Sequence, residues 1–496
     1  MDICRRKFGA CILAGLAARA VALPPRPKLL VLLILEQLRP DYLDNIWPQT
    51  GTGGLRRLVD GGAYFPDCRH SASTFTASTL ATLATGAWPA QHGIVADSWY
   101  DRRAKKPVRA SDEDLRATTL GSQIVAAPDT RLFVTSLDPV DSALFAGTSA
   151  ARLFWMSDGG QFVTRGPEPR WLADYNRLKP IQTLHNAPWV AVGAPTDAPR
   201  LRTLAFDPAH PQEFLSLYKA SPFAQAAQFE FAAELISRER LGQSSTFDFL
   251  CIISSPAALL GYESGAHSPL MRQMTLQLDR QLEFLLAQLD RAPGIDMFNF
   301  VLAGAHGAPP APANETRARL AVNGEMLAQA IQQSLTKSNG GRIAKYLYPF
   351  LYLDMDGSPV PEASREAAGR AALEQPQVAA YFTAGGACSI HDDWERRFRN
   401  SFFQGRAGDV MLSYNPEYIE DYGAGRGISY GSLYNYDVRT PLCFYGPQFR
   451  ARALEYPVEA VDIAPTLARA IGVASPSSSV GRVLADAFAG PEPRTQ

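Results

Sequence analysis

The stretch of the chain that carries the most candidate chemistry runs from His70 to Asp101 and is rich in hydroxyl side chains. Its pattern predicts a turn and then a short helix from Ala77 to Thr85, which Gly86 and Pro89 would end. A threonine at such a helix start holds its hydroxyl beside unpaired backbone N–H groups and the positive end of the helix dipole, where an anion would bind. The alternative is ordinary helix capping. Three residues are candidate caps: Ser71, Ser73 and Thr74.

The elements that must position this helix belong to a chain of ordinary globular composition. Its 496 residues, 46% of them hydrophobic and 20% charged, are enough for one large domain with insertions or for two domains. The formal net charge of -1 gives no reason to propose nucleic acid or an anionic membrane surface as a partner. We therefore expect a soluble, folded protein that does not bind nucleic acid.

Residues 1–22 carry the features of a signal peptide. The basic stretch Arg5–Lys7 precedes a modest apolar run, Phe8–Ala18, and Ala20–Ala22 fits a cleavage site of small residues. The adjacent arginines resemble a twin-arginine signal, although an ordinary secretory signal and an uncleaved anchor are alternatives. Because the apolar run is short for a membrane span, we expect a periplasmic or secreted protein with no stable membrane span after cleavage.

The mature chain shows the alternation of strands and helices that is typical of an α/β fold. Lys28–Leu35, Phe247–Ser255 and Phe298–Ala303 are continuous apolar runs, as expected for strands buried on both faces of a parallel sheet. Leu270–Leu289 lies between the last two and has the periodicity of an amphipathic helix. The order of these segments predicts a large, mostly parallel sheet with helices on both faces.

Other segments are predicted to complete or to cover this sheet. Asp409–Tyr414 and Pro441–Tyr445 are short strand candidates, and Val461–Ile471 is a predicted helix with Pro465 in its first turn. Residues of about 110–240 and 345–405 have weaker periodicity and more proline, aspartate and aromatic residues. We expect these two regions to be insertions that form a cap.

Six segments, in this order, resemble the alkaline phosphatase superfamily, in particular the monomeric alkaline phosphatases of its type I phosphodiesterase/nucleotide pyrophosphatase branch. They are LLILEQLRPDYL from Leu32, TGAWPAQHGI from Thr85 with SWYD from Ser98, GAHG from Gly304, RAGDV from Arg406, GISYGSLYNYDVRTPLCFYG from Gly427 and VDIAPTLARAIGV from Val461. The resemblance implies one alkaline-phosphatase-like domain over residues 28–490.

In that family two zinc ions lie at the carboxyl edge of the sheet, and a threonine or serine attacks phosphorus. The resemblance places the attacking hydroxyl at Thr76. Of six family ligand positions, two keep a side chain that can bind a metal: Glu36, where the family has an aspartate, and His306. The other four positions have lost their ligands and hold Ala258, Tyr262, Ala305 and Tyr430. Because a zinc site needs at least three protein ligands, the sequence predicts a dismantled two-zinc site, with zinc as a cofactor only if the family chemistry survives.

The residues that contact phosphate in relatives are also replaced. An asparagine of the family corresponds to Asp97, a predicted substrate-binding residue whose negative charge would repel a phosphate. The lysine and arginine of one branch correspond to Asp138 and Val140. Tyr262 and Tyr430 are expected to fill the former metal cavity and to hydrogen-bond each other or Glu36.

Two functional hypotheses follow from these replacements. In the first, the protein is a degenerate phosphatase or phosphodiesterase whose inherited cleft binds an unknown small-molecule or protein ligand. In the second, it is an active phosphoric-ester hydrolase with a reduced or rearranged metal site built from Glu36, Thr76 and His306. Glu263 and His267 could join that site, because residues spaced i, i+4 share one face of a helix.

Overall fold

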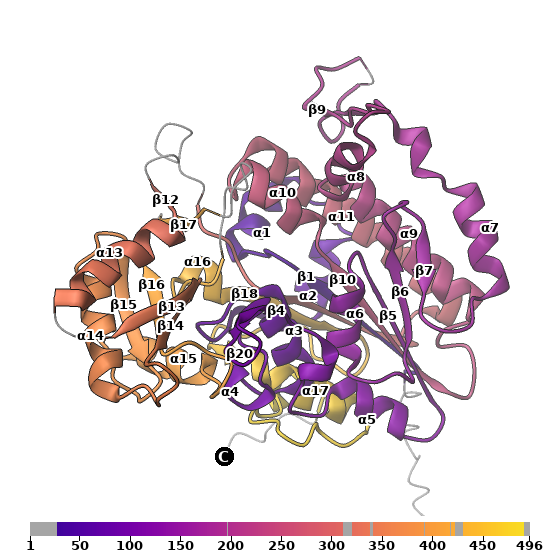
Figure 1. The fold of residues 1–496 in the computed structure, drawn as a ribbon. Coiled ribbons are helices and arrows are strands. Elements are labelled where there is room, and N and C mark those ends of the chain that lie inside the picture. The colour runs from indigo at the N-terminus through magenta and orange to yellow at the C-terminus, as the bar shows by residue number, and fades with distance from the viewer. Residues whose placement is uncertain are drawn as a thin grey trace, which may run out of the picture.

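The computed structural model describes residues 27–195, 197–310, 320–337, 341–390, 392–416, 418–421 and 430–490, and the predicted signal peptide, residues 1–22, lies outside them. The fold is built on a ten-stranded sheet in the order β19-β2-β18-β11-β1-β10-β5-β6-β7, with β20 paired to β2 (Figure 1). The neighbours β11, β1, β10, β5 and β6 are parallel, whereas β18 and β7 run antiparallel to the strands beside them. The sheet is therefore mostly parallel, as predicted. Its strands are β1 (Leu29–Leu35), β2 (Ala63–Arg69), β5 (Thr130–Ser136), β6 (Arg152–Met156), β7 (Phe162–Thr164), β10 (Phe247–Ser254), β11 (Phe298–Gly304), β18 (Arg439–Tyr445), β19 (Arg452–Ala453) and β20 (Val458–Glu459).

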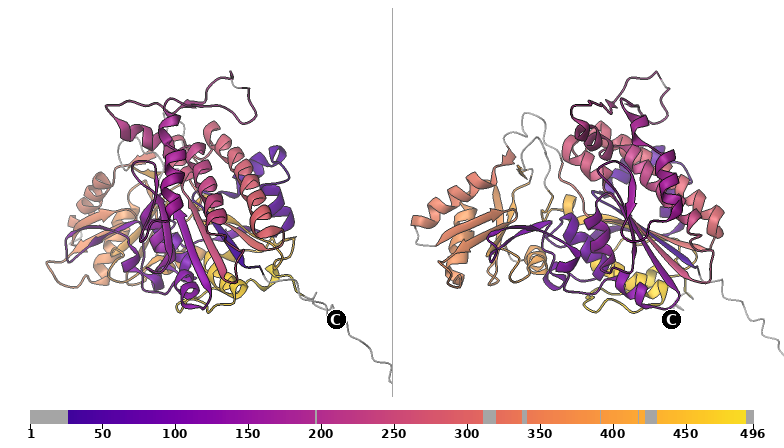
Figure 2. Two further views of the ribbon diagram at one scale, coloured as in Figure 1. Left: turned by 90° about the vertical axis from the view of Figure 1, so that its right-hand side faces the viewer. Right: turned by 45° about the vertical axis from the view of Figure 1, so that its right-hand side comes forward.

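Helices cover both faces of this sheet (Figure 2). The side chains of β1 alternate between two hydrophobic cores, with Leu29, Val31 and Leu33 in one and Leu30, Leu32 and Ile34 in the other, so the strand has no polar face. The first core also holds apolar side chains of α1 (Pro40–Ile46), α2 (Leu55–Gly61), α9 (Pro222–Arg238) and α11 (Pro269–Leu289). The second holds those of α3 (Thr76–Thr85), α5 (Leu120–Ala126), α6 (Pro139–Ala146) and α17 (Ile463–Ile471). Within the described residues, none of the helices is both long and apolar enough to cross a lipid bilayer.

Part of the first predicted cap insertion, residues 110–240, belongs to the central sheet instead. Residues 130–164 supply β5, β6 and β7, which extend the sheet beyond β10. The prediction is wrong for these residues because β5 opens with the polar Thr130 and Arg131 and β7 is only three residues long, so neither shows a long apolar run. The elements of this region outside the sheet are α7 (Arg170–Leu178), β8 (Pro188–Trp189), β9 (Arg202–Thr203) and α8 (Pro211–Lys219).

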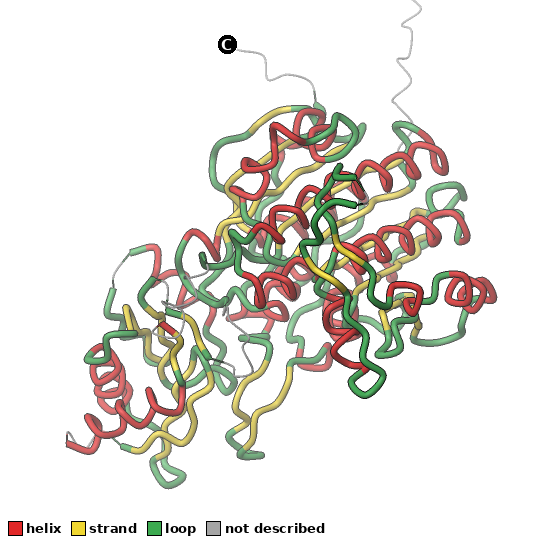
Figure 3. Tube along the Cα trace, turned by 90° about the horizontal axis from the view of Figure 1, so that it is seen from above, coloured by secondary structure: helices red, strands yellow, loops and turns green. Residues whose placement is uncertain are grey.

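A second, antiparallel sheet of four strands in the order β13-β14-β16-β15 forms a separate unit beside the first sheet (orange in Figure 1; Figure 3). The unit includes the second predicted insertion, residues 345–405, and it also takes the predicted strand 409–414, which pairs here and not in the central sheet. Its elements are α13 (Gly324–Lys337), β13 (Arg342–Leu347), β14 (Phe350–Asp354), α14 (Glu362–Leu373), β15 (Val378–Thr383), α15 (Asp393–Ser401) and β16 (Val410–Tyr414); the short strands β12 (Ala321–Val322) and β17 (Ile419–Glu420) pair nearby. This unit has its own hydrophobic core.

One buried ion pair at the start of β5 gives a first prediction. The Asp248 carboxylate is 0% exposed and accepts hydrogen bonds from Arg131 Nε at 2.7 Å and Nη2 at 2.9 Å. Arg131→Met would leave this buried carboxylate without its counter-ion, so we expect the free energy of unfolding to fall by about 2–3 kcal/mol in urea titrations. The matched control is Arg152→Met, because Arg152 lies over the same Phe133 ring but pairs with the more exposed Glu239. There we expect less than about 1 kcal/mol, and equal losses in the two variants would contradict the argument.

Candidate functional site

The candidate site begins where β1 ends and α3 starts. Thr76 is the first residue of α3, and its hydroxyl donates a hydrogen bond to Glu36 Oε2 at 3.0 Å. Glu36 is 4% exposed, and burial raises its pKa to about 8, an effect that the nearby carboxylates of Asp97 and Asp138 increase and the Thr76 hydrogen bond opposes. At neutral pH Glu36 is therefore mostly a neutral acid, and it does not withdraw a proton from Thr76.

The N-terminus of α3 is capped by a side chain from outside the helix. Asp97 Oδ1 accepts a hydrogen bond from the backbone N–H of Ala77 at 2.8 Å. Asp97 therefore occupies, with its own negative charge, one of the backbone donors to which an anionic substrate would otherwise bind. Burial raises the pKa of this carboxyl group, while the Ala77 N–H opposes the rise.

The predicted caps Ser71, Ser73 and Thr74 do not cap this helix. The N-cap is Phe75, which has extended backbone angles and no side-chain cap, so the predicted residues lie too early in the chain to reach the first turn. The Ser73 hydroxyl instead bonds Ser78 at 2.9 Å and the Val95 carbonyl. The end of the helix is as predicted, because Gly86 follows it with a left-handed φ of 64°.

Tyr430 contacts three other residues of the predicted site. Its hydroxyl donates a hydrogen bond to Asp97 Oδ2 at 2.9 Å, and its ring stacks on His306 with the centroids 4.5 Å apart. Tyr262, from α10 (Pro256–Ser264), has its ring centroid 5.3 Å away and is hydrogen bonded to Tyr430. The predicted contact between the two tyrosines is therefore confirmed, although Tyr430 bonds the carboxylate of Asp97 and not that of Glu36. Burial and the Asp97 charge raise the pKa of Tyr430 well above its usual value, so its phenol stays protonated.

His306 follows β11 and is completely buried. Its Nδ1 lies 2.7 Å from the Gly307 carbonyl, which fixes Nδ1 as the protonated nitrogen and leaves Nε2 with its lone pair. Burial lowers the pKa of His306 to about 4, so the ring is neutral at physiological pH. Among the residues that the structure describes, neither Nε2 of His306 nor Oε1 of Glu36 has a hydrogen-bond partner.

These two unpartnered atoms are what a lost metal site would leave behind, but they do not make a zinc site. Ala258 and Ala305, at two of the predicted lost positions, are fully buried methyl side chains without donor atoms. Over the described ranges, no group of three or more His, Cys, Asp or Glu side chains is arranged to hold a metal ion. The residues present therefore do not fit the two zinc ions that the family resemblance implies.

Glu263 and His267, the candidates for a rearranged site, are held elsewhere. Glu263 forms a bidentate pair with Arg202 of β9, with one contact at 3.0 Å. His267 Nε2 lies 3.1 Å from Asp41 Oδ2 in α1. Both side chains are about half exposed, unlike the buried Glu36 and His306. The structure thus does not bring the two pairs together into one site.

The structure adds carboxylates from α6 to the site. Asp138 caps α6 by accepting from the Val140 N–H at 2.9 Å, and it pairs with the exposed Arg109 at 3.0 Å. Asp141, one turn along, was not predicted as a site residue; burial and the nearby Glu36 raise its pKa well above the usual value. The only sequence signal for it was an acidic residue in the first turn of a helix after a sheet strand. The carboxyl groups of Glu36, Asp97, Asp138 and Asp141 thus gather at the site.

Comparison with known proteins identifies the fold and the family of this chain. The fold, with its mostly parallel central sheet and flanking helices, is alkaline-phosphatase-like. The model of the type I phosphodiesterase/nucleotide pyrophosphatase family matches residues 30–424, and the chain belongs to this family.

Individual relatives are similar over nearly their whole length. Alkaline phosphatase PafA of Elizabethkingia meningoseptica is 24% identical over 97% of this chain and 98% of its own, and alkaline phosphatase PhoK of a Sphingomonas species is 26% identical over 95% and 93%. The crystal structure of wild-type PafA superposes with a TM-score of 0.83, at 22% identity over 94% of this chain and 99% of its own. A murine ectonucleotide pyrophosphatase/phosphodiesterase 5 in complex with AMP gives a TM-score of 0.57, at 13% identity over 90% and 96%.

Proposed function

We propose that this protein is an exported, degenerate member of its family, in which the two-zinc site has been dismantled and the inherited cleft binds a small-molecule or protein ligand. The observation that carries the proposal is the contact of Tyr430 with Asp97, His306 and Tyr262. Three aromatic rings and a carboxylate now share the space that imidazole ligands and metal would need. Zinc could not be coordinated there without moving them.

The charge around Thr76 supports the same proposal. A hydroxyl nucleophile in a two-metal site needs cations to lower its pKa and to bind the phosphoryl oxygens. Thr76 instead faces Glu36, and the pKa values of Glu36 and Asp141 are both raised in part by neighbouring carboxylates. Although Glu36 itself is mostly neutral, an added phosphate would be repelled by every carboxylate of this cluster that is ionised. The export part of the proposal rests on the predicted signal peptide, and we expect the mature protein in the periplasm or outside the cell.

The rival function is an active phosphoric-ester hydrolase with a reduced metal site. It is favoured by the full-length similarity to alkaline phosphatases and by the retention of Thr76 and His306. Fold similarity at this identity does not carry activity by itself, because activity depends on the side chains of the site.

One experiment on the mature protein separates the two functions. We expect purified protein equilibrated with zinc to hold no stoichiometric metal by atomic absorption. We also expect Thr76→Ala to change the turnover of aryl phosphate mono- and diesters by less than about twofold, because no activated hydroxyl is lost. One or two zinc ions per chain, together with turnover abolished by Thr76→Ala, would instead establish the hydrolase.

A further inference from the structure

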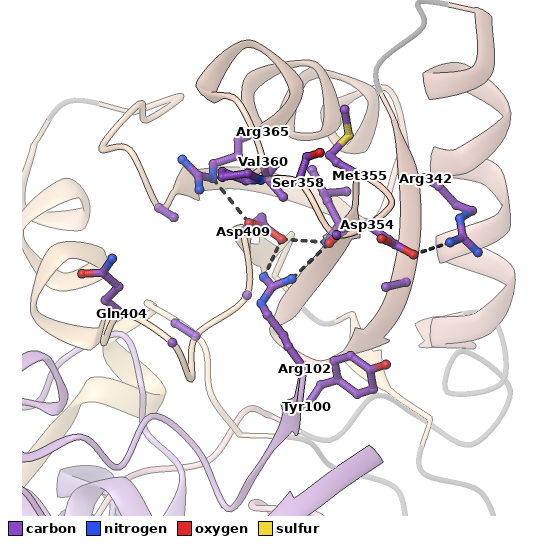
Figure 4. A pocket seen from close by; sticks show the side chains of 18 of the residues that line it. Tyr100, Arg102, Arg342, Asp354, Met355, Ser358, Val360, Arg365, Gln404 and Asp409 are labelled. Carbon is purple, nitrogen blue, oxygen red and sulfur yellow. Dashed lines mark hydrogen bonds and ion pairs between the residues drawn. The ribbon is translucent and has the colours of Figure 1, made fainter. Parts of the chain in front are cut away.

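A cleft of about 1140 Å³ lies between the hairpin β3 (Ser98–Asp101) and β4 (Lys106–Arg109) and the four-stranded unit (Figure 4). The hairpin contributes Tyr100, Arg102 and Lys105 to its lining. None of the described residues around Thr76 lines it, so it is separate from the candidate site above. Its volume is slightly above the range of about 300–1,000 Å³ that is usual for ligand pockets.

Part of the lining of the cleft is a network of charged side chains around Asp409. The Asp409 carboxylate is 4% exposed and accepts from the Leu353 N–H at 2.6 Å and from Arg102 Nη2 at 2.6 Å. Arg365 Nε reaches its other oxygen at 3.4 Å, and Figure 4 shows the two guanidinium groups approaching Asp409 from different sides. Arg102 also donates to the Leu353 carbonyl at 3.0 Å, which fixes the hairpin against the small sheet. The network therefore has a buried carboxylate at its centre and two partly exposed guanidinium groups around it.

Positive charge exceeds negative charge in the lining of the cleft. Four cationic side chains line it, against two carboxylates, and these are Arg102, Lys105, Arg342 and Arg365 against Asp354 and Asp409. Arg342 is paired with Asp354, and Arg365 also contacts Glu362 at 3.1 Å from behind the lining. Lys105 has no hydrogen bond or ion pair with any residue that the structure describes, and its side chain is exposed. Lys105 is therefore the cation available to a ligand.

Apolar side chains line the same cleft beside the charged ones (Figure 4). Met355, Pro359, Val360 and Phe402 line it, and Ser358 stands at the exposed turn between β14 and α14. An occupant of the cleft would therefore meet both charged and apolar side chains, and a molecule with an anionic group and an apolar body suits this lining. Carboxylates and phosphates are the groups that guanidinium and ammonium donors bind best.

We propose that this cleft binds an organic anion, with a carboxylate or phosphate head on Lys105 and the Arg102–Arg365 network and an apolar body against Met355 and Val360. This binding is independent of the function proposed for the Thr76 site. The two head groups share one chemistry, and the choice of probes separates them.

The test is isothermal titration of the mature protein with phenyl phosphate, phenylacetate, inorganic phosphate and benzyl alcohol. We expect one of the two aromatic anions to bind more tightly than inorganic phosphate, and benzyl alcohol not to bind. Lys105→Glu should weaken the binding of that anion by about tenfold or more, because it replaces the free cation by a repelling charge. The matched control is Lys106→Glu, because Lys106 is exposed on the same hairpin but does not line the cleft. The affinity of this variant for the same anion should stay within about twofold of the affinity of the unaltered protein.

A second variant tests shape independently of charge. Ser358→Trp places a large ring in the cleft from an exposed turn and should also reduce binding at least about tenfold, with the fold verified by circular dichroism. Equal weakening by the two lysine variants would mean non-specific charge attraction and would overturn the proposal. So would undisturbed binding in Ser358→Trp, or no binding of either aromatic anion by the unaltered protein at millimolar concentration.

Discussion

Placing metal ligands at the four positions where the family resemblance implies them is expected to give this protein tight zinc binding. The variant combines Ala258→Asp, Tyr262→His, Ala305→Asp and Tyr430→His with Glu36→Asp. It would add two carboxylates and two imidazoles to His306, whose buried Nε2 already carries a free lone pair. It would also remove the Tyr430 ring, which now covers His306. With six ligands available, zinc binding on the order of 10 kcal/mol becomes possible, whereas the unaltered protein offers only two separate side chains.

The six-ligand variant should be less stable than the unaltered protein without zinc and more stable with it. Two new carboxylates at the fully buried Ala258 and Ala305 positions are unpaired until a cation binds. At zinc concentrations of about 100 times the dissociation constant, binding should stabilise the fold by about 3 kcal/mol in thermal unfolding. The control replaces the same positions by Ala258→Asn, Tyr262→Phe, Ala305→Asn and Tyr430→Phe; each asparagine matches the size of an aspartate without its charge, and phenylalanine has no ligand atom. A six-ligand variant that takes up no more zinc than this control would show that the backbone around the site does not hold these side chains in a zinc-binding geometry.

The sequence predicted the parts of the fold in which one pattern has one structural meaning. β1, β10 and β11 were found from continuous apolar runs because nearly every residue in them is buried between two layers of helices. The sequence pattern does not predict β5 or the pairing of the antiparallel strands in the small unit. Their ends are polar, and their burial depends on neighbours far away in the sequence. Pairing across such distances is a tertiary property that local periodicity does not carry.

The candidate site, like the fold, could be predicted from the sequence only in part. Family resemblance placed Thr76, Asp97 and Tyr430 in one region, and their hydrogen bonds through Glu36 and the Ala77 N–H agree with that grouping. The effect of Glu36 on the pKa of Asp141 could not be predicted, because no sequence pattern reports that a side chain of α6 lies beside the end of β1. The direction of these pKa shifts depends on burial, which only the three-dimensional arrangement defines.

A buried carboxyl group beside the site gives the last prediction. Asp437, in the short helix α16 (Asn435–Val438), is completely buried; one oxygen accepts from the Ser432 N–H at 3.0 Å, and the other has no partner among the described residues. Burial raises its pKa from 3.8 to about 7, and Ser432 and Arg39 oppose the rise. The folded protein thus binds this proton more tightly than the unfolded chain. The stabilisation of the fold by protonated Asp437 is complete below pH 4 and is lost as the pH rises to about 7. It amounts to about 1.4 kcal/mol per unit of pKa difference between the folded and unfolded states.

Asp437→Asn removes this loss, because the amide keeps an acceptor for the Ser432 N–H and cannot ionise. We expect the variant to be more stable than the unaltered protein by about 2–4 kcal/mol at pH 8 and nearly equal to it at pH 4, as measured by urea unfolding at both pH values. The matched control is Asp248→Asn, the same chemical change at a carboxylate that is also 0% exposed but bonded to Arg131. That variant should be destabilised at pH 8, since it discards an ion pair. A stabilisation by Asp437→Asn that is the same at both pH values would mean that Asp437 is neutral throughout, so the effect would have to come from the amide's own contacts.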